Sequence, residues 1–405
     1  TAITTAGAQL YRENATIGGN ITFTTGNNDI TFSGTVNSVS STKTLTIVAG
    51  SGDTTFSGTV GGSEALGNTT IGTAGLAAGA FKVQGTLAIT NSAASEIDGV
   101  ISDGDSAGII TKAGAGTLTL SGDNTYTGAT TVNAGTLTIS HADSLGGTDG
   151  ATTVASGAAL SISGGITVAE PITISGTGIS SGGAIVFTGG NNTYSGAITL
   201  GATSTIVSTG GAQTISGTVN AGNGLTITSN SNLTISGVVG GSTALSAYAV
   251  TTTGSGTQTF SANVTTTGNQ TYTAAGGITS SGARTFTSNS GTVNFASALA
   301  GNNNNLTVSG AADIDGAVTN IAVLSITGAS NIGANITSSG TQTYGGAVTL
   351  SANTTLTTSS DVITFSDTVN SDSTTRNLTL ATGGNSTEIN FDGIVGGSNA
   401  AGVIT

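Results

Sequence analysis

The chain has 405 residues, a formal net charge of −13 and only 6% charged residues, and it contains 66 glycines, one proline and one histidine but no cysteine, methionine or tryptophan. The lack of cysteine excludes disulfides, thiolate zinc sites and iron–sulfur clusters. Six cations against 19 acidic residues are too few to neutralise a phosphate backbone, so we expect no nucleic-acid partner. A hydrophobic content of 36% separates the chain from disordered sequences and supports a buried core.

Membrane and export signals are also missing from the sequence. It contains no apolar run of about 18 residues, so we expect no membrane-spanning segment. The first residues, TAITTAGAQLYRENATIGG, lack the basic and apolar regions of a signal peptide. We therefore expect that any signal peptide has been removed or was never part of this chain.

Three blocks of the chain are versions of one unit. Residues 30–47 read ITFSGTVNSVSSTKTLTI, and residues 363–380 read ITFSDTVNSDSTTRNLTL. The correspondence extends over blocks 7–63 and 340–398, and a third copy spans 215–242. Such internal repetition is typical of repeat architectures.

Within these blocks the apolar pattern predicts short strands at a regular spacing. Phe32 and Phe56 are 24 residues apart, and intervals of 20 to 26 residues recur in the other blocks. Aliphatic residues alternate with threonine in Leu45–Val48, Thr117–Leu120 and Thr136–Ile139, as expected for strands with one buried face. Glycine-containing turns cut the chain every 4–8 residues, which leaves no room for ordinary helices.

This combination favours an all-β, right-handed parallel β-helix, or β-solenoid. Propeller blades need about 40–50 residues each, and sandwiches do not require spaced copies of one unit. A solenoid does, because each coil buries its apolar face by stacking on the next at ~4.8 Å. No strict six-residue period occurs, which favours the right-handed form. We expect one continuous solenoid over residues 1–405, with about 18 coils and a length of about 90 Å.

Residues 113–139, AGAGTLTLSGDNTYTGATTVNAGTLTI, resemble the autotransporter-associated β-strand repeat. The matching positions are Gly116, Thr117, Leu118, Leu120, Gly122, Asn124, Thr125, Tyr126, Gly128, Thr130, Val132, Gly135 and Leu137. A degenerate copy, GGNNTYSGAITL, spans residues 189–200, and the remaining repeats resemble those of filamentous haemagglutinin-like surface adhesins. The resemblance implies a bacterial β-helix exported to the cell surface and transfers no catalytic residue.

Two alternatives remain for the acidic residues. Glu96 and Asp98 with Asp103 and Asp105, followed by Lys112, are the best candidates for the carboxylates and cation of a polysaccharide lyase or hydrolase. A turn at residues 98–105 explains the same residues without any activity, because Asp and Gly favour turns. We favour the structural interpretation.

Metal binding has one weak candidate in the sequence. Asp103 and Asp105 offer oxygen ligands that suit calcium, but the nonapeptide calcium repeat is absent. Asp313 and Asp315 have the same spacing and the same structural explanation. His141 has no second histidine or cysteine with which to share a metal, and we interpret it as a solvated residue at a strand end.

The aromatic residues recur in a Q-T-(F/Y) motif. It occurs at Gln258–Phe260, Gln270–Tyr272 and Gln342–Tyr344. A surface row of rings would bind sugars, whereas an internal stack would only stabilise the fold. We favour the internal stack because these positions alternate with threonine.

The sequence thus predicts an extracellular, structural or adhesive β-helical fibre protein of a bacterial surface, with no catalytic residues and no cofactor. The alternative is a carbohydrate-active β-helix enzyme. Neither terminal segment offers a polar cap, so we expect continuation of the solenoid in the same chain or head-to-tail self-association. Surface glycans of host or neighbouring cells are further expected partners.

Overall fold

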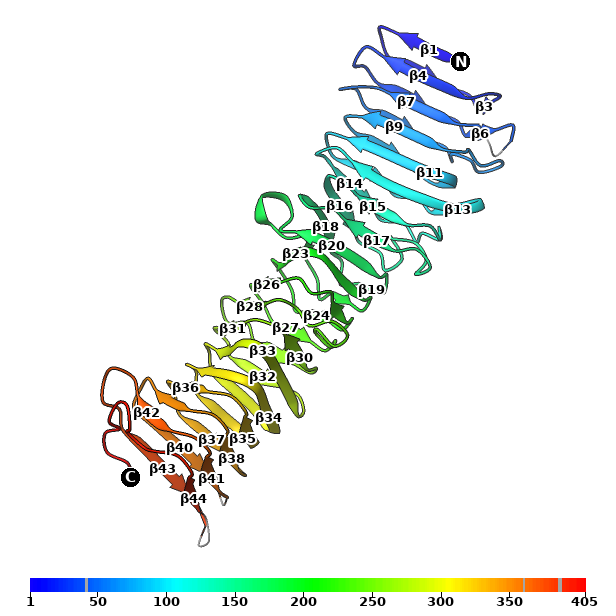
Figure 1. The fold of residues 1–405 in the computed structure, drawn as a ribbon. Helices are drawn as coiled ribbons and strands as arrows, with labels where there is room; N and C mark the ends of the chain where they lie inside the picture. The colour runs from blue at the N-terminus through cyan, green and yellow to red at the C-terminus, as the bar shows by residue number, and fades with distance from the viewer. Residues whose placement is uncertain (41–42, 360, 385–387) are drawn as a thin grey trace. The chain divides into compact units, whose positions relative to one another are not determined.

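The computed structural model describes residues 1–40, 43–359, 361–384 and 388–405. The chain divides into two compact units, residues 1–207 and residues 208–405. Within each unit, short parallel strands lie side by side, turn upon turn (Figure 1). Together the units contain about 18 turns of a parallel β-solenoid, with 54% of residues in strands. This confirms the predicted fold class, while its right-handedness and its continuity over residues 1–405 stay predictions.

The strands of the first unit are β1 (Ala2–Thr5), β2 (Gln9–Tyr11), β3 (Ala15–Ile17), β4 (Ile21–Thr25), β5 (Ile30–Phe32), β6 (Val36–Ser38), β7 (Leu45–Val48), β8 (Thr54–Phe56), β9 (Thr69–Thr73), β10 (Leu76–Ala78), β11 (Phe81–Asn91), β12 (Ser95–Ile97), β13 (Ile101–Ala113), β14 (Thr117–Leu120), β15 (Thr130–Val132), β16 (Gly135–Ile139), β17 (Thr152–Val154), β18 (Ala158–Ile162), β19 (Thr167–Val168), β20 (Ile172–Gly176), β21 (Ile185–Phe187), β22 (Thr193–Tyr194) and, except for its last residue, β23 (Ile198–Ser208).

The strands of the second unit are β24 (Gln213–Ile215), β25 (Val219–Asn220), β26 (Leu225–Ser229), β27 (Leu233–Ile235), β28 (Tyr248–Thr252), β29 (Gln258–Phe260), β30 (Val264–Thr266), β31 (Gln270–Ala274), β32 (Ile278–Ser280), β33 (Arg284–Phe295), β34 (Leu299–Ile314), β35 (Val318–Ile326), β36 (Ser330–Ile332), β37 (Ile336–Ser338), β38 (Gln342–Tyr344), β39 (Val348–Leu350), β40 (Thr354–Thr358), β41 (Ile363–Phe365), β42 (Val369–Ser371), β43 (Leu378–Thr382) and β44 (Ile389–Phe391).

Helical structure is almost absent. Over the described residues the structure contains no α-helix and a single 3-10 turn, η1 (Ile179–Ser181). None of the helical segments in the part of the chain that the structure describes is long and apolar enough to cross a membrane. The expectation of essentially no helix is confirmed.

The register of neighbouring turns places like residues above one another. Leu118 of β14 pairs with Leu137 of β16, and Leu137 pairs in turn with Leu160 of β18. All three leucines are fully buried, whereas the alternating threonines of β14 and β16 lie on the outer face. Each buried leucine contributes about 1.5–3 kcal/mol to folding. The period-two pattern of the sequence therefore identifies the core correctly.

Aromatic rings form internal stacks, as predicted. Phe32 lies 5.2 Å from Phe56 with the ring planes at 7°, and Phe365 lies 4.9 Å from Phe391 at 8°. These pairs belong to directly paired strands, so the 24-residue and 26-residue intervals of the sequence are single turns. The rings of the middle block, such as Phe260, are also buried.

The Q-T-(F/Y) motif forms a buried hydrogen-bond relay. The Tyr272 hydroxyl donates to the Gln270 Oε1 atom at 2.7 Å, and the Gln270 Nε2 atom donates to the Thr287 carbonyl of the next turn at 2.7 Å. Gln342 and Tyr344 repeat both bonds. A fully buried glutamine is thereby satisfied without contact with water.

Phe260→Tyr tests this relay, because Phe260 has no hydroxyl and the buried Gln258 Oε1 atom lacks a hydrogen-bond partner. We expect the new hydroxyl to donate to that oxygen and to raise the free energy of unfolding by about 1 kcal/mol in urea titrations. Phe365→Tyr is the matched control, because Ile363 occupies the glutamine position there and offers no acceptor. The control should lose about 1–3 kcal/mol. Equal destabilisation by both variants would contradict the relay.

Candidate functional site

The acidic residues predicted as an enzyme site lie on different faces of the solenoid. Glu96 of β12 pairs with Ala77 of β10 and Thr119 of β14, and with Asp98 it lines a shallow hollow on the outer surface. Asp103 and Asp105 belong to β13, which pairs with β11 and β15 instead. The two carboxylate pairs therefore do not form one site.

Asp103 has a structural role. Its Oδ1 atom accepts the Gly108 backbone N–H at 2.7 Å, and its Oδ2 atom accepts the Thr127 hydroxyl at 2.7 Å. The segment is not a turn as predicted, because residues 101–113 form one strand with a register shift between Val83 and Gly85 of β11. The calcium site at Asp103 and Asp105 stays a prediction, but donors already engage both oxygens of Asp103.

Lys112 lies inside the solenoid and not beside the carboxylates. Its side chain is fully buried, and the Nζ atom donates to the carbonyls of Ala113 and Gly114 at 2.8 Å and of Ala134 at 3.0 Å. Burial lowers the pKa of Lys112 to about 8, so the ammonium group is mostly charged at pH 7 and all three of its hydrogens are used. No cation from this position faces the predicted groove.

Glycine is required where Lys112 meets the next turn. Gly135 has a φ of +69°, and a Cβ atom there would lie 2.4 Å from the Gly114 carbonyl oxygen and 2.8 Å from the Lys112 Nζ atom. A side chain at this position would displace both the turn and the ammonium group. The glycine at position 135 is therefore explained by a close approach between turns and not by a ligand site.

The second acidic pair is held by asparagines on an outer face. The Asn294 Nδ2 atom donates to the Asp313 Oδ2 atom at 2.7 Å and to the Asp315 Oδ2 atom at 2.9 Å. Asn331, one turn further, donates to the Asp313 Oδ1 atom at 2.8 Å. This ladder of amides and carboxylates supports the structural interpretation.

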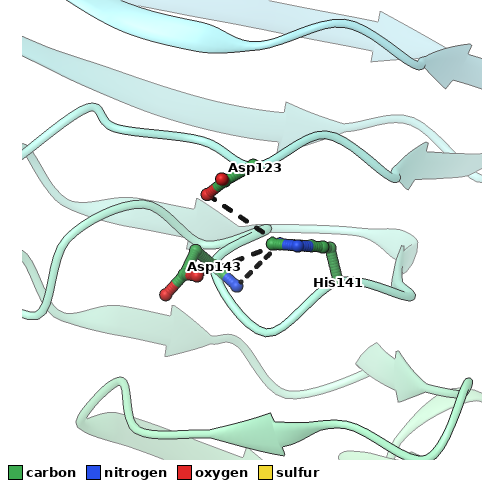
Figure 2. A group of neighbouring side chains, drawn as sticks. All are labelled: Asp123, His141 and Asp143. Atoms are coloured by element: carbon green, nitrogen blue, oxygen red, sulfur yellow. Dashed lines mark hydrogen bonds and ion pairs between the residues drawn. The ribbon is translucent and has the colours of Figure 1, made fainter.

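His141 has acidic neighbours that we did not predict. Figure 2 shows Asp123 and Asp143 beside the imidazole, and the Nδ1 atom lies 4.0 Å from the Asp123 Oδ1 atom and 3.9 Å from the Asp143 Oδ2 atom. One ligand atom from each residue lies within 4.8 Å of the others. Leu120 pairs with Ile139, and this register brings Asp123 beside His141. The match in the sequence between Thr117–Leu120 and Thr136–Ile139 could have revealed this neighbour, because it places Asp123 opposite residue 142.

The chemistry of this group is limited by one hydrogen bond. The Asp143 backbone N–H donates to the His141 Nδ1 atom at 3.2 Å, so that lone pair is already used. Imidazole with two carboxylates suits divalent transition metals, but an ion at Nδ1 would have to displace this N–H. All three side chains are well exposed, at 43% for His141, 67% for Asp123 and 60% for Asp143. The prediction of a solvated histidine at a strand end agrees with this geometry.

The sequence also gave no indication of a buried carboxyl group at Glu170. Its side chain is 4% exposed, and its Oε2 atom has no hydrogen-bond partner. The one unusual feature of the sequence here is Pro171, the single proline of the chain, which restricts the backbone of Glu170 but does not predict burial of its side chain.

Comparison with known proteins identifies one segment of the solenoid. Residues 110–139, which contain β14 to β16 and the buried Lys112, match the family model of the passenger-associated-transport-repeat. The segment is thus similar to an autotransporter passenger repeat. This confirms the resemblance found in residues 113–139, and with the parallel β-solenoid it fits an autotransporter passenger β-repeat protein. No curated protein and no solved structure matches the chain.

Lys112→Met tests the role of the buried ammonium group in the passenger-associated repeat. Three carbonyls would lose their donor while the volume is kept, so we expect the free energy of unfolding to fall by about 1.5–3 kcal/mol in urea titrations. Lys82→Met, on the outer face of β11, is the matched control and should change it by less than about 0.5 kcal/mol. Unchanged stability of the Lys112→Met variant would contradict this role of the ammonium group.

Proposed function

We propose that this chain is a β-solenoid passenger segment of an autotransporter-type protein, displayed outside a bacterial cell as a structural and adhesive element. The match of residues 110–139 to the passenger-associated-transport-repeat carries the proposal. The fold supports it, because turns in the same parallel register continue on both sides of the matched segment. A scaffold of this kind presents long outer faces while its own chemistry stays inert.

The outer faces supply hydroxyl groups in regular rows, which supports glycan partners. One row in the first unit has a threonine on each successive turn, and its members are Thr111, Thr131, Thr153, Thr173 and Thr199. Hydroxyls that point outward without charge suit hydrogen bonding to neutral sugars. Adhesion to surface glycans of host or neighbouring cells is the partner class that we propose.

The enzyme alternative has less support. A glycoside-cleaving site needs two carboxyl groups on opposite sides of one bond. The predicted acids are divided between β12 and β13, and the predicted cation Lys112 is buried. Within the described residues, these positions therefore do not assemble the predicted groove.

Apolar side chains at the first and last turns support self-association. Ile3 of β1 is 37% exposed, and Ile389 and Ile404 are 38% and 39% exposed, although each pairs with a buried residue of the neighbouring turn. Because block 340–398 is a copy of block 7–63, the surface presented by the first turn resembles one that the chain already stacks upon. We propose a second copy, head to tail, as the partner of this surface; continuation of the same chain is the other arrangement that the sequence allows.

Surface display is tested with an antibody against the purified chain on cells of the source organism. We expect labelling of intact cells and removal of the signal by external protease, because a passenger lies outside the outer permeability barrier. A cytoplasmic marker stained only after permeabilisation is the control. Labelling that requires permeabilisation would contradict the proposal.

Head-to-tail association is tested by sedimentation of the purified chain over a range of concentrations. Wild-type protein should form concentration-dependent oligomers, and Ile3→Arg, at a core position of the first turn, should abolish them because a charge cannot be buried between stacked turns. Val100→Arg changes a residue with 41% exposure away from the first turn, and it should associate as wild type does. A wild-type chain that stays monomeric would refute association through this surface.

A further inference from the structure

One corner of the solenoid in the first unit is built from stacked glycines with a single exception. Paired strands place Ile110, Thr130, Thr152, Ile172 and Ile198 above one another, one per turn. The residues two positions earlier are Gly108, Gly128, Gly150, Glu170 and Gly196. We call the part of this corner that carries the glutamate the Glu170 corner.

The turns approach too closely at this corner for an added side chain. A Cβ atom on Gly128 would lie 2.3 Å from the Gly108 carbonyl oxygen, and one on Gly150 would lie 2.3 Å from the Gly128 carbonyl oxygen. A Cβ atom on Gly196 would lie 2.1 Å from the Glu170 carbonyl oxygen. Glycine is therefore the residue that this packing requires, and a glutamate in the column needs a separate explanation.

Two buried tyrosines interact electrostatically with the Glu170 carboxyl group, and their hydroxyls are engaged elsewhere. Tyr126 and Tyr194 are fully buried. The Tyr194 hydroxyl donates its proton to the Glu170 backbone carbonyl at 2.7 Å, and the Tyr126 hydroxyl bonds to the Thr130 hydroxyl at 2.7 Å. The Glu170 Oε2 atom is left without a partner. A charged carboxylate in this position would be strongly unfavourable, whereas a neutral carboxyl group is tolerated.

Burial and the neighbouring negative charge both raise the pKa of Glu170. Burial of the carboxyl group, followed by the negative charge of Asp149, raises the pKa of Glu170 from 4.5 to about 8. Burial, with a smaller effect from Glu170, also holds the pKa values of Tyr126 and Tyr194 well above their usual range. Among the described residues, the ionisable groups that interact electrostatically with Glu170 are these two tyrosines and Asp149, and none of them carries a positive charge.

We propose that the Glu170 corner is a pH-sensitive element: the turns from Thr152 to Tyr194 stay closed while the carboxyl group is protonated and open locally when it ionises. A local opening is sufficient, because each turn of a solenoid contacts only its neighbours. The unfolded or opened chain releases the proton near pH 4.5, whereas the closed chain keeps it to about pH 8. Local stability is therefore complete below pH 4.5, falls as the pH rises to about 8 and is constant above it.

Native-state hydrogen exchange of the whole chain tests this proposal. Peptides covering residues 152–194 are followed by mass spectrometry from pH 4.5 to pH 9, with each rate divided by the intrinsic rate at that pH. Between pH 5 and pH 8 we expect protection of this segment to fall by ~10-fold to 10³-fold, because each pH unit between the two pKa values changes the equilibrium by up to tenfold. Peptides from β4 and β7 in the same unit are the internal reference and should not follow this change.

The variant Glu170→Gln keeps the shape of the side chain without a titrating proton, so protection of residues 152–194 should be independent of pH. Asp149→Asn is the matched control and should keep the fall in protection, with its midpoint at lower pH, because one negative charge near Glu170 is lost. Should Glu170→Gln fail to fold, infrared spectra of wild-type chain labelled with ¹³C at its five glutamates replace it. One carboxylic-acid band that persists to neutral pH supports the proposal. The same pH dependence in wild type and Glu170→Gln, or ionisation of all five glutamates below pH 6, would overturn it.

Discussion

The in-register stacking of one turn on the next is the constraint on which the rest of the structure depends. A single turn has no second layer of its own, so its inward side chains are buried only because the neighbouring turns supply matching ones. The leucine column of β14, β16 and β18 and the paired rings of Phe32 and Phe56 show this directly. Because parallel strands must be spaced evenly, like residues recur at every turn.

The same stacking determines how polar groups are buried. An inward polar side chain has no access to water, so its partners must come from its own turn or from the next one. Gln270 achieves this with a tyrosine hydroxyl and a carbonyl one turn away, and Lys112 with three carbonyls. Glu170 has no such arrangement, which makes its protonation the means by which the corner stays packed. Buried polar groups in this fold therefore take their partners from neighbouring turns or, like the Gln258 Oε1 atom and the Glu170 Oε2 atom, are left without one.

The display role that we propose uses the outer faces of the solenoid. Asp103 and Asp313 serve the packing of neighbouring turns through hydrogen bonds. Register brings Asp123 beside His141, whereas Asp143 follows His141 by two residues, and the imidazole Nδ1 lone pair accepts the Asp143 backbone N–H (Figure 2). The similarity of residues 110–139 to a passenger-associated repeat agrees with a scaffold whose role is display.

The sequence by itself determined the strand pattern, the coil length and the buried face, because these depend on local alternation and on a repeat that returns every 20 to 26 residues. It also located the passenger-associated repeat and the internal aromatic stacks. Only the tertiary structure decided which distant residues meet, since a coil that varies by a few residues leaves the register between turns open. Register places Glu96 and Asp103 on different strands of the stack. It also buries the side chain of Lys112 and places Glu170 in a column of glycines. The physical reason is that side-chain environment in a solenoid is set by the turns above and below, not by neighbours along the chain.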